Sequence, residues 1–160
     1  MDRRQGLRRY NDSPFTGVAT RTFVDGTIAE RAEFREGKRH GQLSIWFPNG
    51  VLALRARFSS GKRHGLTETW WANAMPRSRT RYVAGVADGI GWSWYRSGER
   101  FKRRQYRLGE PEGLQLGWRR NGKLFSNFEI RHGRAYGLQN SNLCIELNDE
   151  QVVSASATRL

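Results

Sequence analysis

Glycine recurs every 24 residues along most of this chain, and this period limits the possible folds more than any other feature. Three glycine columns share one register: Gly17, Gly41, Gly65, Gly89, Gly113 and Gly137; Gly37, Gly61, Gly85, Gly109 and Gly133; and Gly26, Gly50, Gly98 and Gly122, with Ala74 in the missing place. Glycine at such short intervals would break an α-helix repeatedly. A fixed period of this length is typical of a repeat protein, in which each unit packs on its neighbours.

Aromatic residues follow the same period. The three columns are Trp46, Trp70, Trp94 and Trp118; Phe23, Phe47, Trp71 and Tyr95; and Phe34, Phe58, Tyr82 and Tyr106. In one unit, residues 42–47 are rich in strand-forming residues, and residues 52–58 alternate apolar and polar residues as a half-buried strand does. Pro48-Asn49-Gly50 predicts the turn between them, the Asn-Gly pair supplying positive φ. Residues 59–65, with glycine at both ends, predict the second turn.

These units predict an all-β protein, a single-layer twisted antiparallel β-meander built from 24-residue hairpin repeats. About 11–13 strands follow from two strands per unit and the end pieces. Residues 1–16 form an N-terminal basic segment and cap strand, and residues 17–137 form five hairpin repeats. Residues 138–148 form a C-terminal cap strand, and 149–160 a polar tail that is loose or adds a short strand. Caps are expected because bare sheet edges would pair with other chains.

The repeat unit resembles the MORN (membrane occupation and recognition nexus) family, and most closely its bacterial variant often labelled antitoxin-like. The residues that carry the likeness are Trp46-Phe47-Pro48-Asn49-Gly50-Val51-Leu52, Phe58-Ser59-Ser60-Gly61-Lys62-Arg63-His64-Gly65 and the opening Pro14-Phe15-Thr16-Gly17. The resemblance covers about residues 14–137 and implies the hairpin fold rather than one function. It also implies a cell-envelope lipoprotein whose leader has been removed. Ala74 departs from the pattern, as do residues 86–88 and 110–112, which replace Lys-Arg-His.

The chain is strongly basic, with 28 Lys and Arg against 15 Asp and Glu, a net charge of +13. Such a surface attracts acidic proteins, anionic membranes or polysaccharides, and nucleic acids. Charge that serves only solubility is the other interpretation. Residues 1–10 lack the hydrophobic stretch of a signal peptide. We therefore expect either a cytoplasmic protein or a cell-envelope protein.

Arginine recurs at one repeat position and predicts a binding surface. Arg31, Arg55, Arg79 and Arg103 occupy this position, Asn127 ends the column, and Arg57 and Arg81 lie beside it. In a meander, equal positions two strands apart lie ~9–10 Å from each other on one face. Guanidinium forks bind carboxylate and phosphate in two-point contacts. Alternatively, these arginines pair with Glu30, Glu33, Glu68 or Glu99 as a solvated face.

The tryptophan column has two interpretations. Aromatics interleaved with basic residues can stack on bases or sugars. Repeat-spaced aromatics also form the core between units. Trp92 lies outside the columns and is the expected exposed aromatic.

We predict no catalytic residues, no metal site and no cofactor. His40, His64 and His132 have no repeated carboxylate or cysteine beside them to complete a metal site, and we expect them to pack in turns or donate to a neighbouring loop. Cys144 is the only cysteine. A lone cysteine in an apolar segment is more typical of a buried small hydrophobe than of a nucleophile.

The expected function is that of a non-enzymatic repeat scaffold, a protein–protein interaction module whose basic face meets an acidic partner. The alternative is attachment to an anionic membrane or polysaccharide surface through the arginine column, and nucleic-acid binding ranks after both. Exposed edge strands would also allow oligomers to form.

Overall fold

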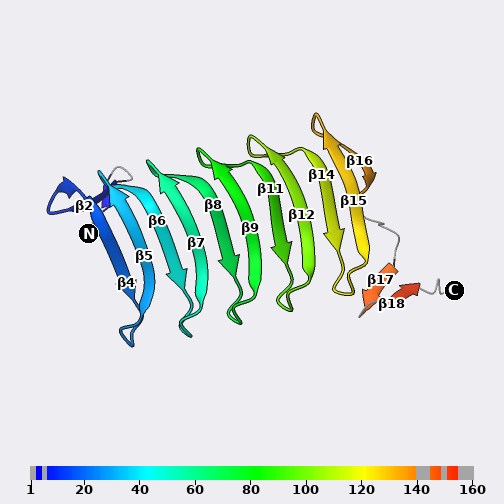
Figure 1. Ribbon diagram of the computed structural model, residues 1–160, viewed down its shortest axis with the longest axis horizontal. Coiled ribbons are helices and arrows are strands. Elements are labelled where there is room, and N and C mark those ends of the chain that lie inside the picture. Colours follow the sequence, from blue (N-terminus) through cyan, green and yellow to red (C-terminus); the bar gives the residue numbers. More distant parts are fainter. Residues whose placement is uncertain (1–2, 5–6, 140–144, 149–150, 155–160) are drawn as a thin grey trace, which may run out of the picture.

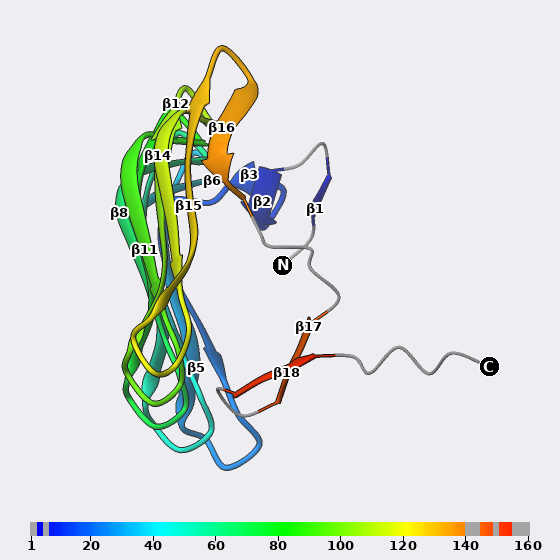
Figure 2. The same ribbon diagram turned by 90° about the vertical axis from the view of Figure 1, so that its right-hand side faces the viewer.

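The computed structural model describes residues 3–4, 7–139, 145–148 and 151–154, with side chains from residue 8 to 139. Most of the chain forms one open antiparallel sheet of 13 strands, in which neighbouring strands follow each other along the sequence (Figure 1). Seen from its edge in Figure 2, the sheet is a single twisted layer. The predicted all-β meander is therefore confirmed.

The main sheet consists of β4 (Gly17–Thr22), β5 (Ile28–Arg35), β6 (Lys38–Trp46), β7 (Leu52–Ser59), β8 (Lys62–Trp70), β9 (Pro76–Val83), β10 (Val86–Ala87), β11 (Gly89–Trp94), β12 (Arg100–Arg107), β13 (Glu110–Pro111), β14 (Gly113–Trp118), β15 (Leu124–Arg131) and β16 (Arg134–Leu138). β1 (Arg3–Arg4), β2 (Leu7–Tyr10) and β3 (Ser13–Pro14) form a small second sheet. β17 (Ile145–Asn148) and β18 (Gln151–Ser154) pair with each other. Cys144 lies outside the described residues, as do parts of the expected cap strand and tail.

The second turn of each unit has two residues, so the expected seven-residue turn at 59–65 is wrong. Ser60 and Gly61 both have positive φ, 48° and 83°, and Ser59 pairs with Lys62 across them. Positive φ at both positions is the geometry of a type I′ turn, whose twist matches that of the flanking strands. The same pair of positive φ values recurs at residues 36–37, 84–85, 108–109 and 132–133. Lys62 to Gly65 therefore belong to strand β8.

The duplicated segment Gly-Lys-Arg-His-Gly consequently has a structural role within a strand. Its arginine at position 39 lies over the ring of Phe58, 5.6 Å from the centroid, and Arg63 lies over Tyr82 at 5.2 Å. Each arginine thus covers an aromatic residue of the following unit, an arrangement that favours contact between neighbouring hairpins.

The first turn of each unit depends on one glycine and on an amide side chain. In residues 47–51, the Gly50 N–H donates to the Phe47 carbonyl at 2.9 Å, and Gly50 has φ 79°. The positive φ comes from Gly50 rather than from the Asn-Gly pair, and Asn49 acts through its side chain. Its Oδ1 accepts from the Val51 N–H at 3.2 Å, and its Nδ2 donates to the Ala72 carbonyl at 2.8 Å. This second bond joins consecutive units.

One face of the sheet, which we call the core face, holds the buried apolar cluster. Ala19, Ala32, Leu43 and Phe34 form this cluster. The N-terminal segment packs against it: the ring centroids of Phe15 and Phe34 are 5.9 Å apart, and the Arg8 N–H donates to the Gly37 carbonyl at 2.8 Å. Figure 2 shows β2 and β3 lying against this side of the sheet. The N-terminal segment therefore covers the core face at its first repeat.

The buried core is small for a chain of this length. The buried apolar residues among those described are Ala19, Ala29, Ala32, Phe34, Leu43 and Ala56. Contacts between units supply much of the remaining cohesion: the Gly61 N–H donates to the Arg39 carbonyl at 2.8 Å, and the Tyr95 hydroxyl donates to the Trp118 carbonyl at 2.9 Å. Stability in such an array is close to a sum of unit and nearest-neighbour terms.

The one unit that lacks the turn glycine gives a direct stability test. Ala74 has φ 65°, in the left-handed region where glycine stands in the other units. We expect Ala74→Gly to stabilise the protein by about 0.5–1 kcal/mol, because a left-handed conformation costs a residue with a Cβ about 1–2 kcal/mol and part of the gain is lost to chain entropy. Urea unfolding measures the change.

Gly50→Ala is the matched control for this turn. A Cβ at Gly50 would meet no atom within 4 Å, so the substitution changes backbone strain without creating a clash. It should destabilise the protein by about 0.5–1 kcal/mol. A loss of stability in Ala74→Gly would contradict the assigned turn geometry.

Candidate functional site

The four arginines of the repeat column lie in one row that crosses the sheet. Residues directly opposite each other on adjacent strands share a face. The row consists, in order, of Thr20, Arg31, Ser44, Arg55, Glu68, Arg79, Trp92, Arg103, Leu116, Asn127 and Leu138, each opposite the next. We call the face that carries this row the arginine face. The core face is the other side of the same sheet.

Acidic residues neutralise part of the row. Glu68 stands between two arginines and pairs with both, at 2.7 Å from Arg55 and 3.8 Å from Arg79. Arg31 pairs with Glu33 at 3.5 Å. The Arg103 guanidinium donates to the Leu114 carbonyl at 3.0 Å instead of to a carboxylate. Pairing with glutamate is thus found at three of the four arginines.

Two further predicted residues lie beside the row on the same face. Arg57 stands opposite Gln42, and Arg81 stands opposite Leu66. Both are exposed, and neither forms an ion pair with a described residue. The six predicted arginines face Glu33 and Glu68, so six positive charges less two negative ones leave a local excess of four.

Glu30 and Glu99, the other expected partners, do not pair with the row. Glu30 pairs with Arg21 at 3.4 Å and Arg39 at 3.3 Å. Hydrogen bonding from Ser97, more than the nearby Arg120, lowers the pKa of Glu99 below its ordinary value. The expected neutralisation therefore comes from Glu33 and Glu68 alone.

Trp92 occupies the row between Arg79 and Arg103. It is half-buried, so the expectation of an exposed aromatic is wrong. The reason is stacking: its ring centroid lies 6.5 Å from that of Trp94 and 6.0 Å from that of Trp118, with interplanar angles of 27° and 19°. These tryptophans connect two consecutive units on the arginine face, while their outer surfaces remain partly accessible.

The arginine face changes character along the array. The row arginines that pair with glutamate, Arg31, Arg55 and Arg79, lie in its first part, whereas Trp92, Leu116 and Leu138 lie in its last part. Leu138 is 53% exposed, and exposed Ile90 (46%) and Leu114 (39%) lie beside this last part. The row is thus charged in its first part and mixes arginine with apolar side chains in its last part.

A second feature, which the sequence reasoning missed, lies on the opposite side of the sheet. On this face, each unit contributes two positions from its first strand and two from its second, which gives four columns of equivalent residues. The first-strand columns are Ala19, Leu43, Thr67, Gly91 and Gln115, and then Arg21, Ile45, Thr69, Ser93 and Gly117. The second-strand columns are Ala32, Ala56, Thr80, Arg104 and Phe128, and then Glu30, Leu54, Ser78, Lys102 and Ser126. The central residues change from apolar to hydroxyl-bearing and then to basic. These columns could have been found in the sequence, but they contain no repeated residue type to attract notice.

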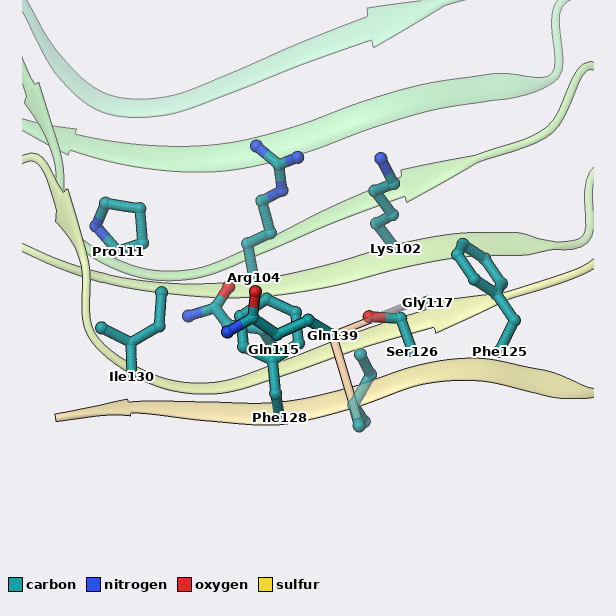
Figure 3. Close-up of a pocket in the computed structure, with 11 residues that line it drawn as sticks. Lys102, Arg104, Pro111, Gln115, Gly117, Phe125, Ser126, Phe128, Ile130 and Gln139 are labelled. Atoms are coloured by element: carbon teal, nitrogen blue, oxygen red, sulfur yellow. The ribbon is translucent and has the colours of Figure 1, made fainter. Parts of the chain in front are cut away.

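The core face is hollowed where its residues become basic. One hollow of about 400 Å³ lies over β12, β14 and β15, and a neighbouring one of about 260 Å³ lies over β9, β11 and β12. Both are lined by Lys102 and Arg104, and we call the two together the trough. Figure 3 shows Lys102 and Arg104 extending side by side from β12, with Gln115, Ser126 and Phe128 also around the larger hollow.

Within the described part of the chain, the two cations of the trough are not neutralised: neither Lys102 nor Arg104 forms an ion pair there. The Lys102 ammonium lies 4.5 Å from the centroid of the Phe101 ring. Burial, and secondarily the charge of Arg104, lowers the pKa of Lys102 below its ordinary value. Both causes disfavour the charged form, and the attraction of an anion placed here would oppose them.

Among the repeat histidines, His40 contacts the turn of the neighbouring unit. The His40 Nδ1 accepts a hydrogen bond from the Ser60 N–H at 3.4 Å, so it accepts from the neighbouring turn rather than donating to it. Within the described part of the chain, no group of three or more His, Cys, Asp and Glu side chains could hold a metal ion.

Two comparisons with known proteins find no match for this repeat array. No family model matches the chain, and a search of curated proteins finds no match. The described residues include no helix long and apolar enough to cross a membrane. The resemblance to MORN repeats therefore rests on the sequence motifs themselves.

The ionisation of Lys102 provides a test of the trough geometry. We expect Arg104→Gln to raise the pKa of Lys102, because it removes the nearby positive charge, while burial still keeps that pKa below the ordinary value. Carbon-13 NMR of reductively methylated protein, with the Lys102 resonance assigned by Lys102→Arg, measures it. Arg103→Gln, on the same strand but the other face, should change it less. Equal shifts in the two variants would contradict the placement of Arg104.

Proposed function

We propose that the protein is a non-enzymatic repeat scaffold whose arginine face binds an acidic protein partner. The observation that carries this proposal is the unbroken row in which Arg31, Arg55, Arg79 and Arg103 stand on alternate strands of one face. Such spacing matches an extended acidic segment, because each arginine can bind a carboxylate through two parallel hydrogen bonds. We also propose that the repeats are MORN-like, on the basis of their sequence motifs.

The mixture of side chains near the row favours a protein over a simple polyanion. Trp92 and Leu116 alternate with arginines in the second half of the row, and exposed Ile90 and Leu114 lie nearby. Protein interfaces are enriched in tryptophan and arginine, which often dominate the binding energy. A partner with acidic and apolar residues along one stretch would match both halves of the face.

The proposal includes no reaction because of the composition of the arginine face. The arginine face combines guanidinium groups with tryptophan and aliphatic side chains, which suit recognition. The side chains of its row include a hydroxyl at Ser44 and a carboxylate at Glu68, and Glu68 is already paired with two arginines. Covalent catalysis requires a nucleophile beside a base, and the proposal assigns no such pair to this face.

Charge removal in the row tests the proposed interaction. Partners are first captured from source cells with the wild-type protein, and affinity for each purified partner is then measured by calorimetry. Replacing Arg31, Arg55, Arg79 and Arg103 together with glutamine should weaken binding at least about tenfold, because complementary charges and their hydrogen bonds are lost across the interface. The affinity of the wild type should fall only moderately with salt, since apolar contacts contribute.

A charge-matched variant separates the row from overall charge. Replacing Arg96, Arg120, Lys123 and Arg134 with glutamine also removes four positive charges, but from turns and the terminal strand β16. The net charge falls by four, from +13 to +9, as it does in the row variant. This variant should bind its partner nearly as the wild type does. Equal losses in both variants would contradict a specific row. Row-dependent binding to anionic vesicles or oligonucleotides, falling steeply with salt and without any protein partner, would favour the alternative ligands instead.

A further inference from the structure

We infer that the trough on the core face is a second binding site, which takes a small organic anion: a carboxylate or phosphate joined to a flat apolar body. The site is separate from the arginine face, since it lies on the opposite side of the sheet. Three observations support it: the two hollows, the pair of cations Lys102 and Arg104 between them, and the polar and aromatic side chains that line them.

The space lies where two strand positions carry glycine and other units carry larger side chains. Gly91 stands at the position of Leu43 and Thr67, and Gly117 at that of Ile45 and Thr69. Neither glycine has a positive φ, so turn geometry does not require them. A Cβ at Gly117 would lie 2.9 Å from the Phe125 ring and one at Gly91 3.0 Å from the Thr80 hydroxyl. Glycine at these two positions therefore lets side chains that line the trough lie directly on the backbone of β11 and β14.

The charge lies at the centre of this space. Lys102 and Arg104 are two residues apart on β12, so their side chains leave the same face of the strand. Each lines both hollows. An ammonium and a guanidinium side by side, without a described carboxylate partner, form a binding site for one anionic group that both can contact.

Neutral polar groups surround the cations and suit an anion. Lys102 on β12 stands opposite Ser93 on β11 and opposite Gly117 on β14. Ser126 on β15 stands opposite Gly117, one strand further along the sheet. Both serine hydroxyls line the trough and can donate a hydrogen bond. Gln115 is buried, and its Nε2 donates to the Gln105 carbonyl at 2.9 Å, which holds the amide in place.

Aromatic side chains give the site its apolar part. Phe125 and Phe128 line the larger hollow, and Phe101 and Tyr106 line the smaller one. Flat apolar groups pack well on such rings. Because the larger hollow has a volume of about 400 Å³, its size suits a small molecule rather than a folded partner. The ligand class is therefore an aromatic or similarly flat carboxylate or phosphate.

The test uses benzoate and phenyl phosphate as probes, and benzyl alcohol as their uncharged counterpart. Binding to the full chain is followed by the amide shifts of β11, β12 and β14 in ¹H–¹⁵N NMR spectra. We expect saturable binding of at least one anion, with benzyl alcohol binding at least tenfold more weakly. The two anions show whether a carboxylate or a phosphate is preferred.

Three neighbouring residues on β12 supply the decisive variants. Lys102→Gln and Arg104→Gln should each weaken binding of the preferred anion at least fivefold. Arg103→Gln removes an equal charge between them but on the arginine face, so it should leave the affinity within twofold of the wild type. Equal losses in all three variants would show general charge attraction and overturn the proposal, as would binding of benzyl alcohol as strong as that of the anions.

A space-filling variant tests the cavity without changing charge. Ser93→Ile introduces the residue that the repeat itself carries at the equivalent position, Ile45, so the strand should tolerate it. It should reduce anion binding at least fivefold while far-ultraviolet circular dichroism remains that of the wild type. Unchanged affinity in this folded variant, or no saturable binding of either anion to the wild type, would overturn the proposed site.

Discussion

The two-residue turn with positive φ at both positions is the constraint on which this structure depends. It joins the strands without a loop, and its twist matches that of the sheet, so each hairpin leaves the turn in a fixed register. At the opposite end, a glycine such as Gly50 closes the other turn, and Asn49 bonds to the next unit. Because both turns recur at the same two positions of every 24-residue unit, every repeat position returns to the same face two strands later.

This constant register lets one layer of strands carry two unrelated surfaces. Along β12, Lys102 and Arg104 project to the core face and Arg103 to the arginine face, since side chains alternate in a strand. The buried cluster around Leu43 and Phe34 occupies the core face only in the first units. Later units therefore have room on that face for the trough, while the arginine row continues unbroken on the other.

The sequence predicted the architecture well because glycine and aromatic columns reflect backbone geometry that recurs in every unit. It predicted the arginine row for the same reason, since one residue type repeats at one position. It failed at the turn of residues 59–65, where positive φ at Ser60 is invisible in the residue type. Stacking with Trp94 and Trp118 could not be read from the position of Trp92 outside the columns. The trough was missed because it arises where the columns change from Leu43 or Ile45 to glycine, serine and charged residues.

Distances along the arginine row test the fixed register most directly. Spin labels are attached to cysteines in two double variants, Arg31→Cys with Arg79→Cys and Arg31→Cys with Arg103→Cys, each carrying Cys144→Ser. Four and six strand steps separate these positions, so pulsed electron resonance should give backbone separations of roughly 19 Å and 29 Å after allowance for the labels. Distances that grow by about 10 Å per repeat support an open, single-layer sheet with one register. A second distance no longer than the first, or one spread over many values, would contradict it.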